Sequence, residues 1–476
     1  MSKIEYGVII QSGLEDWQIV QQVDGRGSFT LEGRWASLMD LYTHEVQEHY
    51  NKLNPVYQVY VAVVDENNSQ HIIPWTKADM LEDNKWKLHI ADIPAGGLYR
   101  VETCLDYSSG NAIQWAHRGD MVHHVGVGDL YVITGQSNSA GYGKDPIYDP
   151  PTLGVHLLAN SGKWKLAANP LNESTNILNL NMLEHANPGT SPYMSFARKI
   201  KEFTGYPIGL IQASRGGSAL SEWNISEDGH LYKTMLEIVK SATEKITGIL
   251  WYQGCSDTDT EKSTSYLERF TEFVNKTRLD LGDENIPFLT FQLNRHISRW
   301  RNEDTDKAWA RVREAQREAS KKIKGVYVIP TLDTTLTDEI HISSPGNMIL
   351  GDRLANLALK YIYKKNIVAD APDISKAYFT SAKEVKADFD NLTGVLYDYG
   401  TPVHSLFFTI EDSKGIVEIS DYQISGSSIT FILSRECEGD CYIHHAPWQT
   451  FAGLPFKDNV NHLPVLAFYG VPVQKN

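Results

Sequence analysis

Short runs of alternating apolar and polar residues dominate the first part of the chain. From Tyr57 to Val63, apolar side chains stand at every second position, so they share one face of an extended strand. Similar runs at residues 86–90 and 98–101 are separated by clusters of Asp, Asn, Pro and Gly, which are typical of turns. The pattern predicts a β-sandwich-like domain over residues 1–127.

The rhythm changes between residues 128 and 366, where apolar segments alternate with longer amphipathic stretches. This alternation is typical of a parallel sheet covered by helices on both faces. Five strands are predicted, at residues 130–134, 208–212, 249–252, 288–293 and 326–330. A final helix is predicted from its cap, Ser344, and from Pro345 at its first helical position, followed by Leu350, Leu354, Leu357 and Tyr361 on one face. An α/β core domain is therefore expected here.

Alternation returns after Pro372. Residues 405–409 and 429–433 read as strands, with Gly and Ser between them in positions typical of turns. The pattern predicts a second β-sandwich-like domain over residues 367–476. No internal repeat interrupts this three-domain organisation, which agrees with a length of 476 residues at roughly 150 residues per domain.

The charge balance excludes two classes of partner. The chain has 44 Lys and Arg residues against 59 Asp and Glu residues, a formal charge of −15. Such a chain repels phosphate groups, so neither nucleic acid nor an anionic membrane is an expected partner. No apolar run approaches the roughly 20 residues that span a bilayer.

The first residues of the chain indicate where the protein is located, and the number of cysteines indicates their redox state. Residues 1–18 lack the apolar stretch of a secretion signal, so a cytoplasmic protein is expected unless a leader was removed from the sequence. Four cysteines, Cys104, Cys255, Cys437 and Cys441, are too few for a disulfide framework. They are expected to be reduced thiols, although Cys437 and Cys441 are spaced to close a hairpin tip under oxidising conditions.

Ser137 is the first candidate catalytic residue. Ligands of open parallel sheets bind at the carboxyl ends of the strands, and Ser137 follows the first predicted strand in Gly135-Gln136-Ser137-Asn138-Ser139. Small and polar neighbours would leave its hydroxyl accessible, which suits a nucleophile. The alternative is that Ser137 merely caps the following helix, as serines after strands often do.

A serine nucleophile needs a base, and among 16 histidines His341 fits best. It lies in Asp338-Glu339-Ile340-His341, between the last predicted strand and the last predicted helix, where the chain returns to the edge that carries Ser137. The spacing lets the Asp338 carboxylate accept a hydrogen bond from one ring nitrogen while the other ring nitrogen faces the serine.

Two strand ends between these segments offer donors for a developing oxyanion. The Gly216-Gly217 pair follows the second strand and allows a backbone N–H group to approach a substrate. Gln253 ends the third strand, and its side-chain amide is a second donor. The alternatives are a plain tight turn for the glycines and a buried structural amide for Gln253.

Taken together, these segments resemble the SGNH hydrolase superfamily, specifically its sialate O-acetylesterase-like carbohydrate esterase branch. The resemblance is carried by GDLYVITGQSNSAG, GLIQASRGGSALSEW, ILWYQGCSDT and DEIHISSPGNMILGDRLA, in this order. Weaker likeness extends to residues 309–316 and Asp333. The resemblance implies an SGNH-type three-layer α/β/α core with a parallel five-stranded sheet between the two β-sandwich-like domains.

The resemblance also implies roles for individual residues. Ser137 would be the nucleophile, His341 the base and Asp338 its orienting acid. The oxyanion hole would combine the Ser137 backbone N–H group, a backbone N–H group of the Gly216-Gly217 pair and the Gln253 side chain.

Three further residues bear on the substrate side of the site. Family members usually carry a glutamate where this chain has Cys255, and no neighbouring histidine or cation favours Cys255 as a rival nucleophile. Trp223 is a candidate to stack on a sugar face, and Arg215 is a candidate to meet a carboxylate or hydroxyl groups. The alternative for Trp223 is packing in the core.

No cofactor is expected. The doublets His123-His124 and His444-His445 lack the spacing of metal ligands, and no phosphate-binding loop or dinucleotide-binding motif follows a strand. Metal, nucleotide and flavin are therefore not expected.

The implied function is a carbohydrate O-acetylesterase that acts through an acetyl-enzyme. Its substrates would be acetylated xylan, xyloglucan or mannan oligosaccharides, or O-acetylated sialic acid, and the flanking domains favour polymer fragments. One alternative is a carbohydrate-binding protein with an inactive esterase-like core. Another is a lipase or thioesterase on the same fold, although the segments after the strand ends are polar rather than apolar. The sequence predicts no oligomeric state.

Overall fold

The computed structural model describes residues 6–37, 43–52, 55–109 and 112–475. Contacts within the chain divide it into two compact units. Unit 1 comprises residues 1–131, 151–167 and 201–210, and unit 2 comprises residues 132–150, 168–200 and 211–476.

Unit 1 contains two largely antiparallel sheets. The first joins, in order, β1 (Gly7–Ser12), β3 (Arg26–Ala36), β7 (Lys85–Pro94) and β6 (Asp79–Met80). The second joins β5 (His71–Lys77), β4 (Val56–Asp65), β8 (Gly96–Ser109) and β9 (Ala112–Gly135), with β2 (Ile19–Gln21) added in parallel to β9. The short helix α1 (His44–Asn51) and the antiparallel pair β10 (Val155–Leu158) and β11 (Trp164–Leu166) complete the elements named here.

The alternating pattern explains these strands. In β7, Trp86, Leu88 and Ile90 are buried while the residues between them are exposed, so one face of the strand turns toward apolar neighbours. Val61 and Val101, from the second sheet, belong to the same hydrophobic cluster. The strands predicted from alternation in this part of the chain are therefore confirmed.

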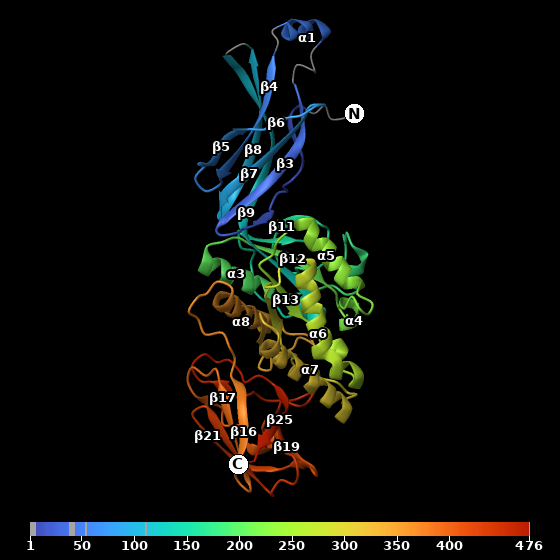
Figure 1. Ribbon diagram of the computed structural model, residues 1–476, viewed down its shortest axis with the longest axis vertical. Helices are drawn as coiled ribbons and strands as arrows, with labels where there is room; N and C mark the ends of the chain where they lie inside the picture. The colour runs from blue at the N-terminus through green and yellow to red at the C-terminus, as the bar shows by residue number, and fades with distance from the viewer. Residues whose placement is uncertain (1–5, 38–42, 53–54, 110–111, 476) are drawn as a thin grey trace. The chain divides into compact units, whose positions relative to one another are not determined.

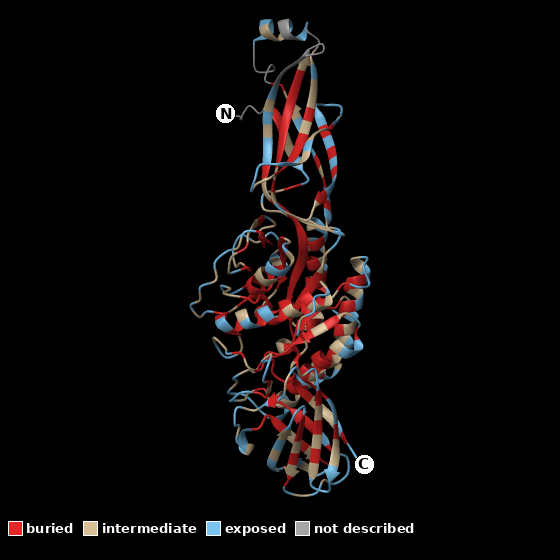
Figure 2. Cartoon of the chain, turned by 90° about the vertical axis from the view of Figure 1, so that its left-hand side faces the viewer, coloured by how far each residue is buried: buried red, intermediate tan, exposed pale blue. Residues whose placement is uncertain are grey.

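Unit 2 is built on the sheet whose strands carry the predicted site. Its strands follow the order β12 (Ile208–Ser214), β9, β13 (Gly248–Tyr252), β14 (Phe288–Phe291) and β15 (Val326–Ile329). Strands β13, β14 and β15 pair in parallel, and every residue of β13 and β14 is buried. Such apolar strands require cover on both faces, and Figure 2 shows buried residues along the central strands.

Helices alternate with these strands, as the sequence predicts. They are α2 (Ser137–Ala140), α3 (Tyr193–Thr204), α4 (Leu220–Trp223), α5 (His230–Ala242), α6 (Thr260–Asp280), α7 (Glu303–Lys322) and α8 (Ser344–Tyr361). In Figure 1, α6 and α8 lie on opposite sides of β13. The mixed α/β class is confirmed. Among the described helices, none is long and apolar enough to cross a membrane.

Helix α8 differs from its prediction in one detail. Ser343, not Ser344, is the N-cap, and its hydroxyl accepts a hydrogen bond from the backbone N–H group of Gly346. Ser344 is the first helical residue, so Pro345 follows one position later than expected. The predicted apolar face is confirmed, since Leu350, Leu354 and Leu357 are buried.

The last part of unit 2 is an eight-stranded, mostly antiparallel sheet. Its order is β20 (Gly415–Val417), β19 (Phe408–Asp412), β23 (Tyr442–His445), β25 (Phe468–Gln474), β16 (Asp373–Ser381), β17 (Glu384–Asp390), β22 (Ser428–Leu433) and β21 (Ile419–Ser425). A small pair, β18 (Leu396–Tyr397) and β24 (Lys457–Asp458), accompanies it. The predicted strand at residues 429–433 is confirmed, but the one at 405–409 starts too early. Pro402 precedes a 3₁₀ turn over Val403–Ser405, and the strand begins only at Phe408.

Candidate active site

Ser137 lies in the sharp turn between strand β9 and helix α2. Gly135 has a φ of +123°, and a Cβ atom there would lie 2.4 Å from the backbone oxygen of Tyr252, so glycine is required. Ser137 is partly exposed, and its hydroxyl makes no hydrogen bond with any described residue. Gln136 is the N-cap residue of α2. The alternative in which Ser137 caps this helix is therefore wrong.

Gln136 ties this turn to the end of the neighbouring strand. Its side-chain oxygen accepts hydrogen bonds from the backbone N–H groups of Gly254, at 2.9 Å, and Ser256, at 3.4 Å. Both residues follow β13. The carboxyl ends of β9 and β13 are thus joined beside Ser137.

Asn138 brings the predicted base to the same place. Its side-chain oxygen accepts from the N–H group of Ile342 at 3.0 Å, and its amide nitrogen donates to the carbonyl of Ile340 at 3.3 Å. These two residues flank His341. Because Asn138 directly follows Ser137, its two hydrogen bonds hold the histidine loop next to the serine turn.

The Asp338 and His341 pair forms as the spacing predicts. The His341 Nδ1 atom lies 2.7 Å from Asp338 Oδ2, and Asp338 Oδ1 accepts from the N–H groups of Ile340 and His341. Burial alone would raise the pKa of the Asp338 carboxyl, but the hydrogen bonds from Ile340 and His341 outweigh it and hold that pKa below its usual range. The carboxylate is therefore ionised and orients the imidazole through Nδ1.

A tyrosine covers the imidazole. The Tyr142 ring stacks on the His341 ring, with centroids 4.7 Å apart and planes 22° from parallel. The Tyr142 hydroxyl donates to Glu184 Oε2 at 2.6 Å. Burial, together with the bond to this carboxylate, raises the pKa of Tyr142 well above its usual value, so the phenol stays protonated.

The glycine turn after β12 offers one open donor. The Gly216 N–H group is already occupied, because it donates to Glu184 Oε1 at 2.6 Å. Gly217 is exposed and has a φ of +74°, and its N–H group has no acceptor among the described residues. The Ser218 hydroxyl closes the turn by donating to the carbonyl of Arg215. Of the predicted glycine pair, Gly217 is thus the one with a free donor.

Gln253 is buried and fully engaged. Its amide nitrogen donates to Asp257 Oδ2 at 2.6 Å and to the Ser218 carbonyl at 3.2 Å, while its side-chain oxygen accepts from the Tyr266 hydroxyl at 3.0 Å. Both amide hydrogens therefore have protein acceptors. A Gln253 donor to an oxyanion stays a prediction, because one of these contacts would have to yield.

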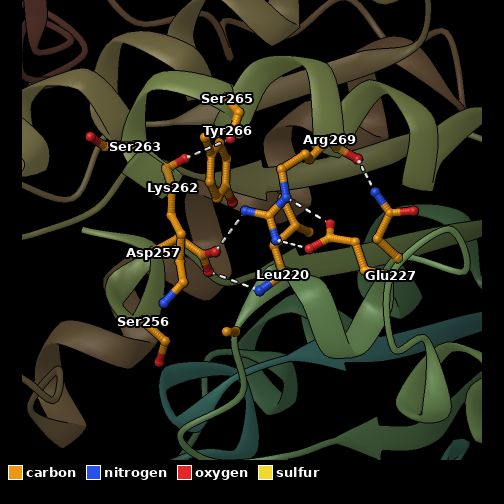
Figure 3. A network of polar contacts seen from close by, with 12 residues as sticks. Leu220, Glu227, Ser256, Asp257, Lys262, Ser263, Ser265, Tyr266 and Arg269 are labelled. Carbon is orange, nitrogen blue, oxygen red and sulfur yellow. Dashed lines mark hydrogen bonds and ion pairs between the residues drawn. The ribbon is translucent and has the colours of Figure 1, made fainter. Parts of the chain in front are cut away.

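Asp257 is the centre of the network that holds Gln253. It is fully buried, accepts from the Leu220 N–H group at 2.8 Å, and forms an ion pair with Arg269 at 3.1 Å. Figure 3 shows Arg269 between Asp257 and Glu227. No role for Asp257 was predicted from the sequence. Its position four residues after Gln253 was the signal that its carboxylate could accept from the Gln253 amide.

The two predicted substrate contacts have different outcomes. Trp223 is fully buried, its indole N–H group donates to Ser218 Oγ, and its ring meets Trp251 edge-on at 5.5 Å. A side chain without exposed surface cannot stack on a sugar, so the prediction for Trp223 is wrong and the packing alternative holds. Arg215 is partly exposed and lies 2.8 Å from His185, which leaves its predicted role open.

Cys255 is not a reactive thiol. Burial of the thiol raises its pKa to about 12, so the reactive thiolate is scarcely populated at neutral pH. Within the described ranges, no group of three or more His, Cys, Asp and Glu side chains is placed to hold a metal ion.

Comparison with known families identifies the class of protein. Residues 127–360 match the family described as carbohydrate esterase, sialic acid-specific acetylesterase. The protein is therefore an ester hydrolase. The match confirms the resemblance predicted from the four motifs.

A solved structure shares the fold over almost the whole chain. A carbohydrate acetylesterase from Xanthomonas citri is similar with a TM-score of 0.64 and 19% identity, over 97% of this chain and 99% of that one. A protein from Arabidopsis thaliana is similar with a TM-score of 0.43 and 24% identity, over 49% of this chain and 99% of that one. No curated protein sequence matches the chain.

Proposed function

We propose that the protein is a serine carbohydrate O-acetylesterase with Ser137 as nucleophile, His341 as base and Asp338 as orienting acid. One observation carries the proposal: Asn138 holds the Asp338–His341 pair beside Ser137 by binding both neighbours of the histidine. An imidazole that is oriented by a carboxylate and lies beside an accessible serine hydroxyl is the arrangement that acyl transfer needs. The Xanthomonas citri neighbour, a carbohydrate acetylesterase, supports acetylated sugars as the substrate class.

The reaction follows in two balanced steps. Ser137 Oγ attacks the acetyl carbon while His341 Nε2 takes the hydroxyl proton, and this proton passes to the sugar oxygen as the ester bond breaks. Water then attacks the acetyl-serine, His341 takes its proton, and acetate leaves as Ser137 regains a proton from His341. The Ser137 and Gly217 N–H groups would receive the negative charge of both tetrahedral intermediates.

The architecture proposed for this activity is a three-layer SGNH-type core at residues 128–366. The segments at residues 1–127 and 367–476 would be β-sandwich-like accessory domains. Two accessory domains suit fragments of acetylated xylan, xyloglucan or mannan better than a single O-acetylated sialic acid. This ranking of substrates rests on domain organisation alone.

The test is acetate release by wild type and by Ser137→Ala. The panel comprises acetylated xylo-, manno- and xyloglucan oligosaccharides and O-acetylated sialic acid. We expect release by wild type from at least one member, and a loss on the order of 10⁴-fold or more in the variant. Full activity of Ser137→Ala would overturn the proposal. No release by wild type, with sugar binding intact, would favour a binding protein with an inactive core.

A further inference from the structure

Glu184 is a buried carboxylate that the reaction above does not use. It follows a short 3₁₀ turn over Leu180–Met182, and only 2% of the residue is exposed. It forms no ion pair with any residue that the structure describes. A carboxylate so far removed from water requires hydrogen-bond donors in compensation.

The donors to Glu184 come from both sides of the proposed active site. Oε1 accepts from the Gly216 N–H group at 2.6 Å and from the Asn172 amide at 3.4 Å. Oε2 accepts from the Tyr142 hydroxyl at 2.6 Å. One carboxylate thus binds the glycine turn with one oxygen and the tyrosine that stacks on His341 with the other.

Each contact has a consequence for the reaction. By occupying the Gly216 N–H group, Glu184 fixes the turn in the conformation that leaves the Gly217 N–H group free. By accepting from the Tyr142 hydroxyl, it holds the aromatic ring against the imidazole and adds electron density to that ring. A more electron-rich ring face stabilises a cation more strongly, and His341 becomes a cation each time it takes a proton.

We propose that Glu184 is a positioning residue that couples the glycine turn to the base His341. It sets the turn geometry through Gly216 and supports the imidazolium through Tyr142. This inference deepens the proposed function and rests on it for the roles of both partners. Glu184 itself does not touch the reacting atoms.

Other charged and titratable groups also surround His341. They are Asp338 and Glu339 in its own loop, Tyr142 and Lys144 in the segment after α2, Asp145, which accepts from the Ser344 N–H group, and His296 in the segment after β14. Lys144 Nζ lies 5.5 Å from the centre of the Tyr142 ring. None of these residues is substituted in a Glu184 variant, so a shift in the titration of His341 reports the change at Glu184 and at the Tyr142 hydroxyl that it binds.

Two substitutions separate the two contributions of Glu184. Glu184→Gln keeps the shape and an oxygen for the Gly216 N–H group but removes the charge. We expect its kcat to stay within about threefold of wild type, while the acid limb of the pH profile moves about half a pH unit lower, because a lost negative charge disfavours the imidazolium. Glu184→Ala also releases the turn, and we expect kcat to fall about 10- to 100-fold with little change in KM.

A third substitution isolates the path through the tyrosine. Tyr142→Phe keeps the stacked ring and the Gly216 contact but removes the hydrogen bond to Glu184. We expect a downward shift of the acid limb and a smaller fall in kcat than in Glu184→Ala. Glu237→Gln, on the exposed side of α5, is the matched control and should change neither quantity.

The decisive measurement is an NMR titration of His341 without substrate, alongside kcat and KM on an acetylated oligosaccharide. A lower His341 pKa in both Glu184→Gln and Tyr142→Phe supports the coupling. Wild-type titration in both variants, with wild-type kcat in Glu184→Ala, would overturn it even if the melting temperature fell. Because the titration needs no turnover, it still tests the coupling if wild type fails to release acetate and the proposed function is lost.

Discussion

The two sides of the candidate active site are built in different ways. On the base side, Asp338 and His341 are three residues apart, and the Asp338 carboxylate makes three contacts within its own loop. On the oxyanion side, the turn at Gly216 and Gly217 depends on partners that are distant in the chain. The base side is a local unit, whereas the oxyanion side is assembled from several elements.

The two sides also differ in burial. The side chain of Asp338 is 48% exposed. Asp257, which holds Gln253 on the oxyanion side, is fully buried and forms an ion pair with Arg269. Removing a half-exposed carboxylate leaves few buried groups without partners, but removing a buried one leaves several. The comparison therefore predicts that activity and stability separate on the base side and fall together on the oxyanion side.

In the comparison of the two sides, the largest expected effect belongs to Asp338→Asn. The substitution keeps the shape but favours the wrong imidazole tautomer, so we expect kcat to fall on the order of 10³- to 10⁴-fold. The free energy of unfolding should change by less than about 1 kcal/mol, because the carboxylate is half-exposed. Steady-state kinetics and urea unfolding check both values. Glu339→Gln is the control, and a large loss of stability in Asp338→Asn would contradict the comparison.

Asp257→Ala should affect both properties. The change leaves the Leu220 N–H group and one of the two Gln253 amide hydrogens without an acceptor in a buried region, although Arg269 keeps its two contacts to Glu227. We expect the free energy of unfolding to fall by about 3 kcal/mol. We also expect kcat to fall about 10- to 100-fold, because Gln253 is no longer held by Asp257. Asp257→Asn should recover part of both losses. Normal stability in Asp257→Ala would remove the contrast between the two sides.

The same contrast explains what the sequence could predict. The five predicted central strands are mostly apolar segments, and Asp338 and His341 lie three residues apart, so short-range pattern was sufficient for both. Glu184 is 32 residues from Gly216 and lies in a segment for which neither a strand nor a helix was predicted. Nothing local marks it as a partner of the glycine turn, because that contact exists only after the sheet has formed.

Errors in prediction have the same origin. Trp223 follows the glycine pair, and the sequence alone does not tell whether an indole there faces the cleft or the core. Its core position depends on Trp251 and Phe273, from different elements. The shift of the α8 cap from Ser344 to Ser343 is a choice between adjacent serines, which no spacing rule resolves.

A third prediction compares two histidines. His341 is partly exposed on the base side, while His445 is fully buried in β23, with its Nδ1 atom 2.9 Å from the Leu466 carbonyl. Burial lowers the pKa of His445 to about 4, from an ordinary value of 6.5. Between these values the unfolded chain binds a proton that the folded chain refuses, so stability should fall as the pH drops from 6.5 to 4.

His445→Gln tests this contribution. The glutamine does not titrate and can still donate to the Leu466 carbonyl, so the loss of stability between pH 7 and pH 4.5 should shrink by about 2 kcal/mol. Urea unfolding at both pH values measures the change. His404→Gln, at an exposed position, is the control and should behave like wild type. An unchanged pH dependence in His445→Gln would show that other groups govern acid unfolding.

The smallest expected effect concerns Gly217, the glycine on the oxyanion side whose N–H group is free. Gly217 and Gly282 have φ angles of +74° and +71°, and a Cβ atom at either position would meet no atom within 4 Å. Alanine at either site therefore costs only backbone strain, and we expect each variant to lose about 1 kcal/mol of unfolding free energy.

Only one of these two variants should affect the reaction. In Gly217→Ala the strained turn redirects the free N–H group, so kcat should fall several-fold, while Gly282→Ala should keep its wild-type kcat because Gly282 follows α6, outside the glycine turn. Urea unfolding and acetate-release kinetics on the pair measure both quantities. Equal stability losses with unequal kcat would place the reaction's donor at Gly217, and equal kcat in the two variants would exclude it. Because the backbone cost is matched, the difference between the variants reports the N–H group alone.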